Sequence, residues 1–363
     1  MRGFTGTIFH ASLGHSMEPF FEFEKPIVNL EKKLRDLQEL AKQEGVDFSN
    51  EITILEKKVI QLIEDTYSKL TPWQKVQLSR HPNRPYTRDY VDALFPDFME
   101  LHGDRTFGDD EAILGGMATW PPAEPGVLTS VDPANQKNRT SILILGHQKG
   151  RTTKQKMERN FGMGKPEGYR KAMRLMALAE RSRMPILTFI DTPGAYPGLE
   201  AEERGQSQAI AESIQTMFNL TVPIVAVVIG EGGSGGALAI GVADAVLMQE
   251  YSTYSVISPE SCASILWSNS AFAEKASGCL KMSPSELLKL GVIDGIIPEP
   301  KGGAHRDHTG ASLLLREALL KTFEPLLKAA KKSPKKMIAD RIQKFRAMGQ
   351  AALDHAPNLS ATP

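Results

Sequence analysis

The stretch Val222-Pro223-Ile224-Val225-Ala226-Val227-Val228-Ile229 leads directly into Gly230-Glu231-Gly232-Gly233-Ser234-Gly235-Gly236-Ala237-Leu238-Ala239-Ile240-Gly241. The first part is apolar and rich in β-branched residues, which predicts a short buried strand. The small residues after the glycines predict the start of a helix. A strand, a glycine turn and a helix N-terminus together present backbone N–H groups that a ligand can approach closely. We therefore expect the turn to hold a negatively charged oxygen, either of a phosphate or of a developing oxyanion.

The spacing of these glycines matches a dinucleotide-binding fingerprint. Gly230, Gly232 and Gly235 fit G-x-G-x-x-G, and Glu250 stands twenty residues beyond Gly230. Five of the seven residues from 230 to 236 are glycine, so almost any glycine motif matches the run. The match alone therefore says little, and a turn that only packs a strand against a helix also explains the run.

The same run also matches the nucleophile elbow of hydrolases. Gly232, Ser234 and Gly236 fit G-x-S-x-G, and Asp294 and His305 follow in the order of a hydrolase triad. A third interpretation uses no side chain, because paired backbone amides alone form an oxyanion hole. In that interpretation Ser234 is a spacer. The absence of His, Asp and Glu between residues 232 and 239 is consistent with it.

A second predicted strand ends in a loop of similar character. Residues 184–190 are mostly apolar, and Asp191-Thr192-Pro193-Gly194-Ala195-Tyr196-Pro197-Gly198 follows them. Two prolines and two glycines predict an irregular loop at the carboxyl end of a strand, where α/β proteins bind ligands. The start of the loop resembles the magnesium segment of GTPases, but no G-x-x-x-x-G-K-[ST] loop stands upstream. A GTPase is therefore excluded.

Apolar residues recur three and four positions apart in two segments near the N-terminus. They are Ile27, Leu30, Leu34, Leu37 and Ala41 in the first segment and Ile52, Leu55, Val59 and Leu62 in the second. This spacing places each set on one narrow face of a helix. Residues 45–50 separate the two segments, so the sequence predicts an antiparallel helical hairpin. Residues 71–88, rich in proline and arginine, are expected to form a linker.

Strands and helices then alternate along the chain. Strands are predicted at residues 113–119, 141–145, 184–190, 222–229, 244–250 and 254–257, and helices over 168–181, over 207–219 and from 235. This alternation predicts βα units with right-handed crossovers and hence an α/β fold. The periodicity does not distinguish a doubly wound sheet from other arrangements of such units. Residues 121–140 hold four prolines and few apolar side chains, which predicts a surface insertion.

The bulk composition excludes several classes of protein. Lys plus Arg equals Asp plus Glu at 43 each, so no net charge attracts nucleic acid. Cys262 and Cys279 form no C-x-x-C pair, which excludes a zinc ribbon and suggests a reducing compartment. No apolar run reaches the length of a membrane span, and residues 1–16 lack the apolar core of a signal peptide. We therefore expect a cytoplasmic protein that binds no metal itself.

Seven segments, in one order along the chain, carry a resemblance to a known family. They are residues 146–151 (GHQKGR), 160–163 (NFGM), 166–172 (PEGYRKA), the loop from Asp191, 201–207 (AEERGQS), the glycine run and 251–260 (YSTYSVISPE). With these segments the chain resembles the carboxyltransferase alpha subunit of bacterial-type acetyl-CoA carboxylase, from about residue 20 to about residue 349. The resemblance implies the crotonase fold, an α/β fold in which ββα units stack as a superhelix.

The resemblance also implies a reaction, substrates and partners. Enzymes of this family move the carboxyl group of carboxybiotin, held on a biotin carboxyl carrier protein, to acetyl-CoA, which gives malonyl-CoA for fatty acid biosynthesis. The chain is then expected to work with a carboxyltransferase beta subunit, as an α2β2 complex, and with biotin carboxylase. Zinc is expected on the beta subunit, and no cofactor is expected to be bound covalently here. A stand-alone crotonase-type acyl-CoA hydratase or hydrolase is the main alternative, and a nicotinamide dehydrogenase is the third.

Candidate site residues follow from the glycine run and from the resemblance. The backbone amides of Gly233, Gly235 and Gly236 are expected to form an oxyanion hole for biotin. Contacts with biotin or substrate are expected from Gly194, Ala195, Gly205, Gln206, Gly232 and Ser234. Residues 149–183 hold eleven Lys or Arg against three Glu. Within this basic stretch Lys149, Arg151 and Lys154 are the candidates for binding the CoA phosphates.

The chain is expected to have four regions. These are an extension at 1–19, the helical hairpin at 20–75, a crotonase-type carboxyltransferase domain at 76–325 that contains the insertion 121–140, and a basic helical tail at 326–363. The extension precedes the start of the family resemblance and is expected to be disordered. The tail is expected to be a solvated helix because lysine and arginine dominate residues 328–346.

Overall fold

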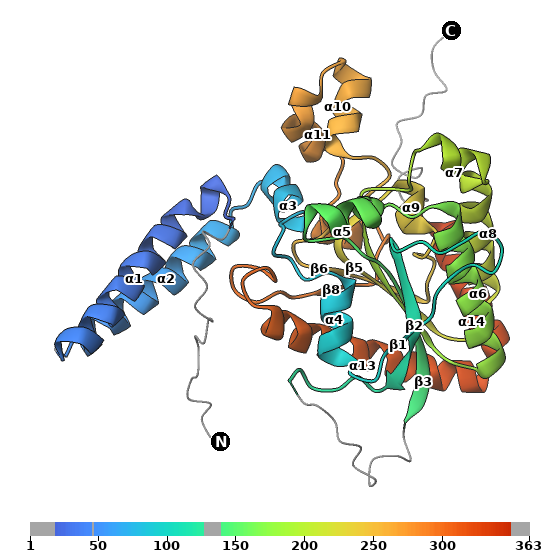
Figure 1. Cartoon of the computed structure of the whole chain (residues 1–363), viewed down its shortest axis with the longest axis horizontal. Helices are drawn as coiled ribbons and strands as arrows, with labels where there is room; N and C mark the ends of the chain where they lie inside the picture. The colour runs from blue at the N-terminus through green and yellow to red at the C-terminus, as the bar shows by residue number, and fades with distance from the viewer. Residues whose placement is uncertain (1–18, 46, 127–138, 350–363) are drawn as a thin grey trace. The chain divides into compact units, whose positions relative to one another are not determined.

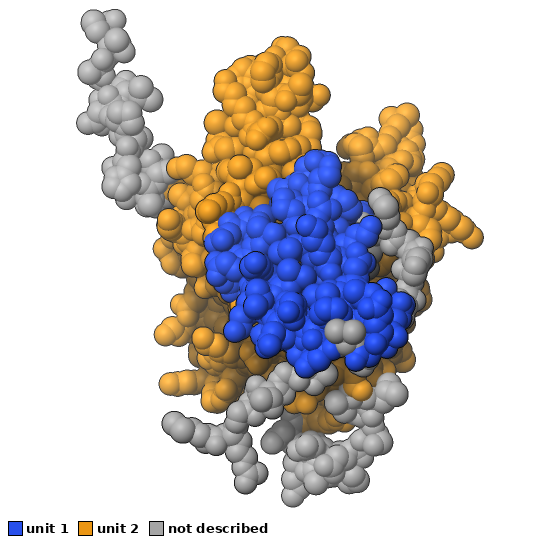
Figure 2. Space-filling view, turned by 90° about the vertical axis from the view of Figure 1, so that its left-hand side faces the viewer, with its two compact units in different colours: residues 1–66 blue, residues 67–363 orange. Residues whose placement is uncertain are grey.

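A computed structural model describes residues 19–45, 47–126 and 139–349 of the chain. Nearly all of the expected extension, most of the insertion and the end of the expected tail therefore lie outside the described residues. The chain divides into two compact units, residues 1–66 and 67–363, which Figure 2 distinguishes by colour. None of the described helices is both long enough and apolar enough to cross a membrane.

Two α-helices and a short 3-10 helix form the described part of the first unit. A short 3-10 helix, η1 (Glu22–Glu24), leads into α1 (Lys25–Glu44), and α2 (Ser49–Tyr67) follows. Gly45, with a φ of 64°, ends α1 in the left-handed conformation that glycine adopts most readily. Ile27 and Leu34 of α1 and Val59 of α2 are buried, and all three belong to the predicted apolar faces. The helical hairpin predicted from the apolar spacing is confirmed.

A sheet of eight strands forms the centre of the second unit (Figure 1). Its strands are β1 (Met99–Glu100), β2 (Ile113–Trp120), β3 (Thr140–His147), β4 (Ile186–Thr192), β5 (Ile224–Gly233), β6 (Ala245–Gln249), β7 (Thr253–Ser255) and β8 (Gly295–Ile297). The order is β1-β2-β3-β4-β5-β6-β8, antiparallel from β1 to β3 and parallel from β3 to β8. The strands predicted from residue 113 to residue 257 are confirmed. The short strands β1 and β8 were not predicted, because so few residues show no periodicity.

The strand β5 has different neighbours at its two ends. Residues 225–228 pair in parallel with β6, whereas residues 231–233 pair in parallel with β7. The first glycines of the run are therefore strand residues, and the turn begins later than the apolar run predicted. The strand β7 therefore branches from the same sheet, beside the last residues of β5. The expected α/β fold is confirmed.

Helices cover both faces of the sheet. On one face α6 (Pro166–Ser182), α8 (Gln206–Asn219) and α9 (Ser234–Leu238) bury apolar side chains, and on the other face α4 (Thr87–Leu94) and α13 (His308–Lys332) do so (Figure 1). The other helices are α3 (Pro72–Ser79), α5 (Thr153–Glu158), η3 (Asn160–Gly162), α7 (Leu199–Glu203), α10 (Pro259–Trp267), η4 (Ser270–Phe272), α11 (Ala273–Cys279), α12 (Pro284–Lys289) and α14 (Pro334–Ala347). The helices predicted over 168–181 and 207–219 are confirmed by α6 and α8.

The prediction of a linker at residues 71–88 was wrong. This segment contains α3 and the start of α4. The side chain of Thr71 accepts the backbone N–H of Gln74, and the Gln74 side chain accepts the N–H of Thr71, so the two residues cap α3. Pro72 occupies the first turn of α3, where the missing N–H has no cost. The proline that suggested a linker therefore marks the start of a helix.

A buried arginine anchors the C-terminal helix α14. Arg341 is 1% exposed, and its guanidinium donates to both carboxylate oxygens of Asp244 at 2.8 Å. It also donates to the backbone carbonyls of Met217, Leu220 and Val222. The expected boundary at residue 326 falls inside α13, and the basic helix beyond it belongs to the same compact unit as the sheet. The segment is therefore not simply a solvated helix.

We predict that Arg341→Met destabilises the protein strongly. The substitution keeps an apolar side chain of similar length but leaves the carboxylate of Asp244 buried without its cation. Breaking a buried ion pair in this way costs about 3–5 kcal/mol of unfolding free energy. Lys328→Met is the matched control, because Lys328 forms only an exposed pair with Glu324 in α13. Loss of this exposed ion pair costs about 0.5 kcal/mol or less of unfolding free energy. Urea titration of both variants checks the prediction, and similar midpoints would contradict it.

Candidate active site

The turn between β5 and α9 lies at the carboxyl end of the parallel strands. β5 ends at Gly233, and α9 begins at Ser234, which has a left-handed φ of 51°. The first four N–H groups of a helix have no acceptor within that helix. Gly233, the residue before α9, has no side chain that could cap these amides. The backbone N–H groups of residues 234–237 are therefore available to a ligand at the N-terminus of α9.

Two of the three predicted oxyanion glycines are held in close backbone contact with the loop after β4. A Cβ added to Gly233 would lie 2.1 Å from the carbonyl oxygen of Pro193. A Cβ added to Gly236 would lie 2.5 Å from the backbone nitrogen of Ala195 and 2.5 Å from the carbonyl carbon of Gly194. These contacts leave no space for a side chain. The structure thus brings Gly194 and Ala195 directly against the predicted hole.

The third predicted oxyanion glycine is less constrained. A Cβ added to Gly235 would have only the side chain of Ile210 near it, at 3.7 Å. This separation is ordinary van der Waals contact. Neither close packing nor a positive φ requires glycine at position 235. Gly235 can therefore contribute its amide with or without a side chain.

The remaining substrate candidates support the turn in different ways. Gly232 is a strand residue, and a Cβ there would lie 2.6 Å from the ring of Tyr254. Gly205 adopts a left-handed φ of 81° at the start of α8. The side-chain amide of Gln206 donates to the carbonyls of Gly164 at 2.8 Å and Tyr196 at 2.9 Å. Gln206 is buried and holds the loop after β4 in place.

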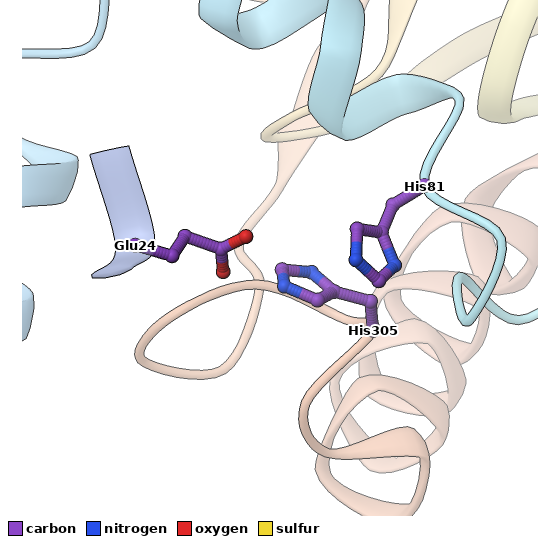
Figure 3. Close-up of side chains that lie close together, drawn as sticks. All are labelled: Glu24, His81 and His305. Atoms are coloured by element: carbon purple, nitrogen blue, oxygen red, sulfur yellow. The ribbon is translucent and has the colours of Figure 1, made fainter. Parts of the chain in front are cut away.

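The structure does not favour the hydrolase interpretation of the run. Asp294 accepts from the backbone N–H of Val246 at 2.7 Å and from Lys344 at 2.8 Å, so it already has two donors. The ring of His305 packs against the ring of His81, with centroids 4.2 Å apart (Figure 3). The expected triad order is therefore not accompanied by the contacts of a triad.

The structure also does not favour the dinucleotide-binding interpretation, because the first glycines of the motif do not form a turn. β5 continues through Gly230 and Gly232, whereas the fingerprint needs these glycines in the turn that follows the strand. A Cβ at Gly230 would lie 2.3 Å from a carboxylate oxygen of Asp191, so this glycine is required by packing. Glu250 accepts the backbone N–H of Glu299 at 3.1 Å. The glycines serve the strand contacts instead.

The candidates for the CoA phosphates differ in their surroundings. Lys149 is 14% exposed, and its ammonium contacts Asp191 and Glu231 at 2.8 Å each. Burial opposes its charged form, but the two carboxylates raise the pKa of Lys149 above its ordinary value. The charge of Lys149 is therefore balanced within the protein, which makes it a weaker candidate for a phosphate than a cation without such partners.

The other two candidates lie nearer the surface. Arg151 pairs with Asp89, donates to the carbonyl of Pro82 at 2.8 Å and lies over the ring of Tyr86. Lys154 is mostly exposed, with only a distant pair to Glu158 at 3.8 Å. Of the three predicted cations, Lys154 keeps the most freedom to meet a ligand.

Sequence reasoning missed a cluster of charges behind the glycine turn. Glu231, inside the run itself, pairs with Lys149 and with Arg80, and Arg80 also pairs with Glu260 at the start of α10. Burial raises the pKa of Asp191, whereas the two cations lower the pKa of Glu231 despite its burial. The only signal in the sequence was the arginine-rich segment 71–88, which we had assigned to a linker.

His147 lies at the end of β3 and is fully buried. Its ring nitrogens interact with the backbone of Gly236 and Phe189 but make no hydrogen bond of ordinary geometry among the described residues. Burial lowers the pKa of His147 from 6.5 to about 3. The imidazole is therefore neutral near pH 7 and is not a general acid.

Known proteins match nearly the whole described chain. Residues 20–349 match the family described as acetyl co-enzyme A carboxylase carboxyltransferase-like. The chain is 52% identical over 331 residues to the acetyl-coenzyme A carboxylase carboxyl transferase subunit alpha of Thermus thermophilus, covering 91% of this chain and 98% of that protein. It is 50% identical over 331 residues to the protein of the same name from Azoarcus sp., covering 91% and 97%. Among solved structures, the beta subunit of P. aeruginosa geranyl-CoA carboxylase is similar with a TM-score of 0.47 and 17% identity, over 69% of this chain and 44% of that one.

We predict that alanine is tolerated at one glycine of the turn and not at its neighbour. Gly236→Ala forces the loop of Gly194 away and should cost about 1–3 kcal/mol of unfolding free energy, as overpacking does. Gly235→Ala is the matched control and should be neutral or slightly stabilising, since alanine favours a helix more than glycine does. Thermal unfolding followed by circular dichroism compares the two variants. Equal losses of stability would show that the close contact at Gly236 does not exist.

The buried His147 predicts a pH dependence of stability. Its pKa is lower in the folded chain than the ordinary 6.5, so the unfolded chain binds more protons below about pH 6.5. The stability contributed by the neutral ring is thus present above that pH and falls as pH drops toward 3. Between about pH 7.5 and about pH 5 the loss is about 2 kcal/mol.

Replacing the ring isolates this contribution from the carboxylates that titrate in the same range. His147→Gln should lose about 2 kcal/mol less than the wild type between these two pH values. Urea unfolding at both pH values gives the comparison. Parallel pH profiles of the two proteins would mean that the pKa of His147 is the same in the folded and the unfolded chain.

Proposed function

This chain belongs to the acetyl co-enzyme A carboxylase carboxyltransferase family, as an alpha subunit, and from that premise we propose that its β5–α9 turn is an oxyanion hole for biotin. Its activity is that of a carboxyltransferase. In the reaction we propose, a carboxyl group moves from carboxybiotin on a carrier protein to acetyl-CoA and gives malonyl-CoA, which enters fatty acid biosynthesis.

The chemistry of this transfer places negative charge on two oxygens. When the bond between N1 and the carboxyl group of carboxybiotin breaks, carbon dioxide leaves and the electron pair stays on biotin, largely on the ureido oxygen. Biotin then takes a proton from the methyl group of acetyl-CoA. The enolate that remains carries its charge on the thioester oxygen, and its carbon attacks the carbon dioxide. Both oxygens are stabilised best by preorganised N–H donors.

The observation that carries the proposal is the backbone contact between the glycine turn and the loop after β4. Gly233 and Gly236 are fixed against Pro193, Gly194 and Ala195, so the amides of the turn are held rigid before any ligand arrives. Rigid donors need no reorganisation during the reaction. We propose that Gly235 and Gly236 in the first turn of α9, together with Gly233 at the end of β5, supply the donors. No side-chain base is needed, because biotin accepts the methyl proton.

The other predicted contacts follow from this placement. We propose that Gly194, Ala195, Gly232 and Ser234 line the biotin site beside the turn. Gln206, at the start of α8 after Gly205, would act through the loop that it holds. Arg151 and Lys154 remain our candidates for the CoA phosphates.

The chain is one subunit of a larger enzyme, since its relatives are named as subunit alpha. We propose a beta subunit that bears zinc and the hole for the thioester, an α2β2 assembly, and the biotin carboxyl carrier protein and biotin carboxylase as further partners. We place the reaction in the cytoplasm, where Cys262 and Cys279, which are free thiols in this structure, would stay reduced.

Reconstitution tests the proposed function. The purified chain alone should form no malonyl-CoA from acetyl-CoA and carboxybiotin, whereas the chain mixed with its beta subunit should form it. In that mixture Ser234→Ala should keep activity within about threefold of wild type, because only the backbone of residue 234 is used, and a nucleophile would lose about a thousandfold or more.

The products are measured by liquid chromatography of the CoA esters. Robust transfer by the chain alone would contradict the proposal that the beta subunit supplies the hole for the thioester. Loss of activity in a folded, partner-bound Ser234→Ala variant would revive the hydrolase interpretation.

A further inference from the structure

We infer that Arg80 is a positioning residue for the oxyanion turn, which it controls through Glu231. The inference rests on the proposed role of the β5–α9 turn. Arg80 follows α3 and lies far from the glycine run in sequence. Nothing in the function described above requires a charge at this position.

The guanidinium of Arg80 holds two carboxylates from different elements. Its Nε donates to Oε1 of Glu231 at 2.5 Å. Its Nη1 donates to Oε1 of Glu260 at 2.5 Å, and its Nη2 donates to Oε2 of Glu260 at 3.3 Å. Glu231 directly precedes Gly232, and Glu260 lies in the first turn of α10. One side chain therefore connects the glycine run, α3 and α10.

Every polar group of Glu231 that could orient it has a partner. Arg80 holds one carboxylate oxygen, and Lys149 holds the other at 2.8 Å. The backbone N–H of Glu231 donates to Oδ1 of Asp191 at 3.0 Å. Glu231 is thus fixed at its backbone by Asp191 of β4 and at its side chain by Arg80 and Lys149.

The charge balance of this cluster makes Arg80 necessary. Arg80 and Lys149 are the two cations, and Asp191, Glu231 and Glu260 are the three anions. Asp191 is 4% exposed and Glu231 is 13% exposed at their side chains, so water screens them poorly. Without Arg80, Lys149 alone would face two carboxylates about equally close. Glu231 would then move away from Asp191, and Gly232 and Gly233 would move with it.

This movement should affect the rate more than substrate binding. Among the described residues, Arg80 forms ion pairs with Glu231 and Glu260. Its proposed effect passes through the backbone of residues 231–233 to the amides that follow. Donors displaced from the oxyanion lose stabilisation in the transition state. We therefore expect kcat to fall and KM for acetyl-CoA to stay nearly constant.

The experiment uses the chain together with its beta subunit. Arg80→Gln should lower kcat about tenfold or more, while KM for acetyl-CoA changes by about twofold or less. Arg80→Lys should recover most of kcat, since one ammonium can still meet Glu231. Glu260→Gln is the matched control, because it removes the other arm of Arg80 and should leave kcat within about twofold. The double variant Arg80→Gln with Glu231→Gln should be no slower than the slower single variant.

A second measurement separates this inference from the proposed function. Amide hydrogen exchange, read by mass spectrometry, should speed up at residues 231–238 in Arg80→Gln and remain near wild type there in Glu260→Gln. Unchanged exchange and kcat in Arg80→Gln would overturn the inference. So would additive effects in the double variant, or an equal fall of kcat in Glu260→Gln. If the wild-type pair made no malonyl-CoA, the proposed function would fail, and the exchange data would still decide whether Arg80 positions the turn.

Discussion

The rest of the site depends on one backbone-to-backbone contact, where the end of β5 meets the loop after β4. Side chains are excluded at Gly233 and Gly236 because the Cβ positions would fall 2.1 Å and 2.5 Å from backbone atoms of that loop. Only glycine permits so close an approach. The contact sets the separation between the amides of α9 and Gly194, and hence the shape of any site between them.

Charged side chains also hold β5 in place. Arg80 pairs with Glu231, and Arg84, four residues later, donates to the carbonyl of Ile229 and pairs with Glu299. The short segment between α3 and α4 thus contacts β5 at Ile229 and at Glu231, the two residues that flank Gly230. Buried charges are costly unless every partner is present, so these residues should act as a unit. In the proposed site, this arrangement would keep the amide donors of the turn rigid.

Sequence patterns predicted the helices and strands better than they predicted which residues come into contact in the fold. The apolar run 222–229 gave the strand, the apolar spacing gave the N-terminal helices, and the resemblance gave the family. The sequence could not show that Lys149 pairs with two carboxylates, because basic composition in a stretch shows nothing of the residues that face it. Asp191 and Glu231, its partners, are 42 and 82 residues away along the chain.

The sequence by itself predicted that a glycine turn follows a buried strand and showed that residues 232–239 hold no His, Asp or Glu. Its resemblance to a known family indicated a carboxyltransferase subunit. Local composition and spacing predict the turns, strands and helices, because these form from neighbouring residues, whereas the seven resembling segments indicate the family. Only the tertiary structure decided which glycines are irreplaceable, where the turn begins and which charges support it. These properties depend on distances between β4, β5, α3 and α10, and such distances exist only once the chain has folded.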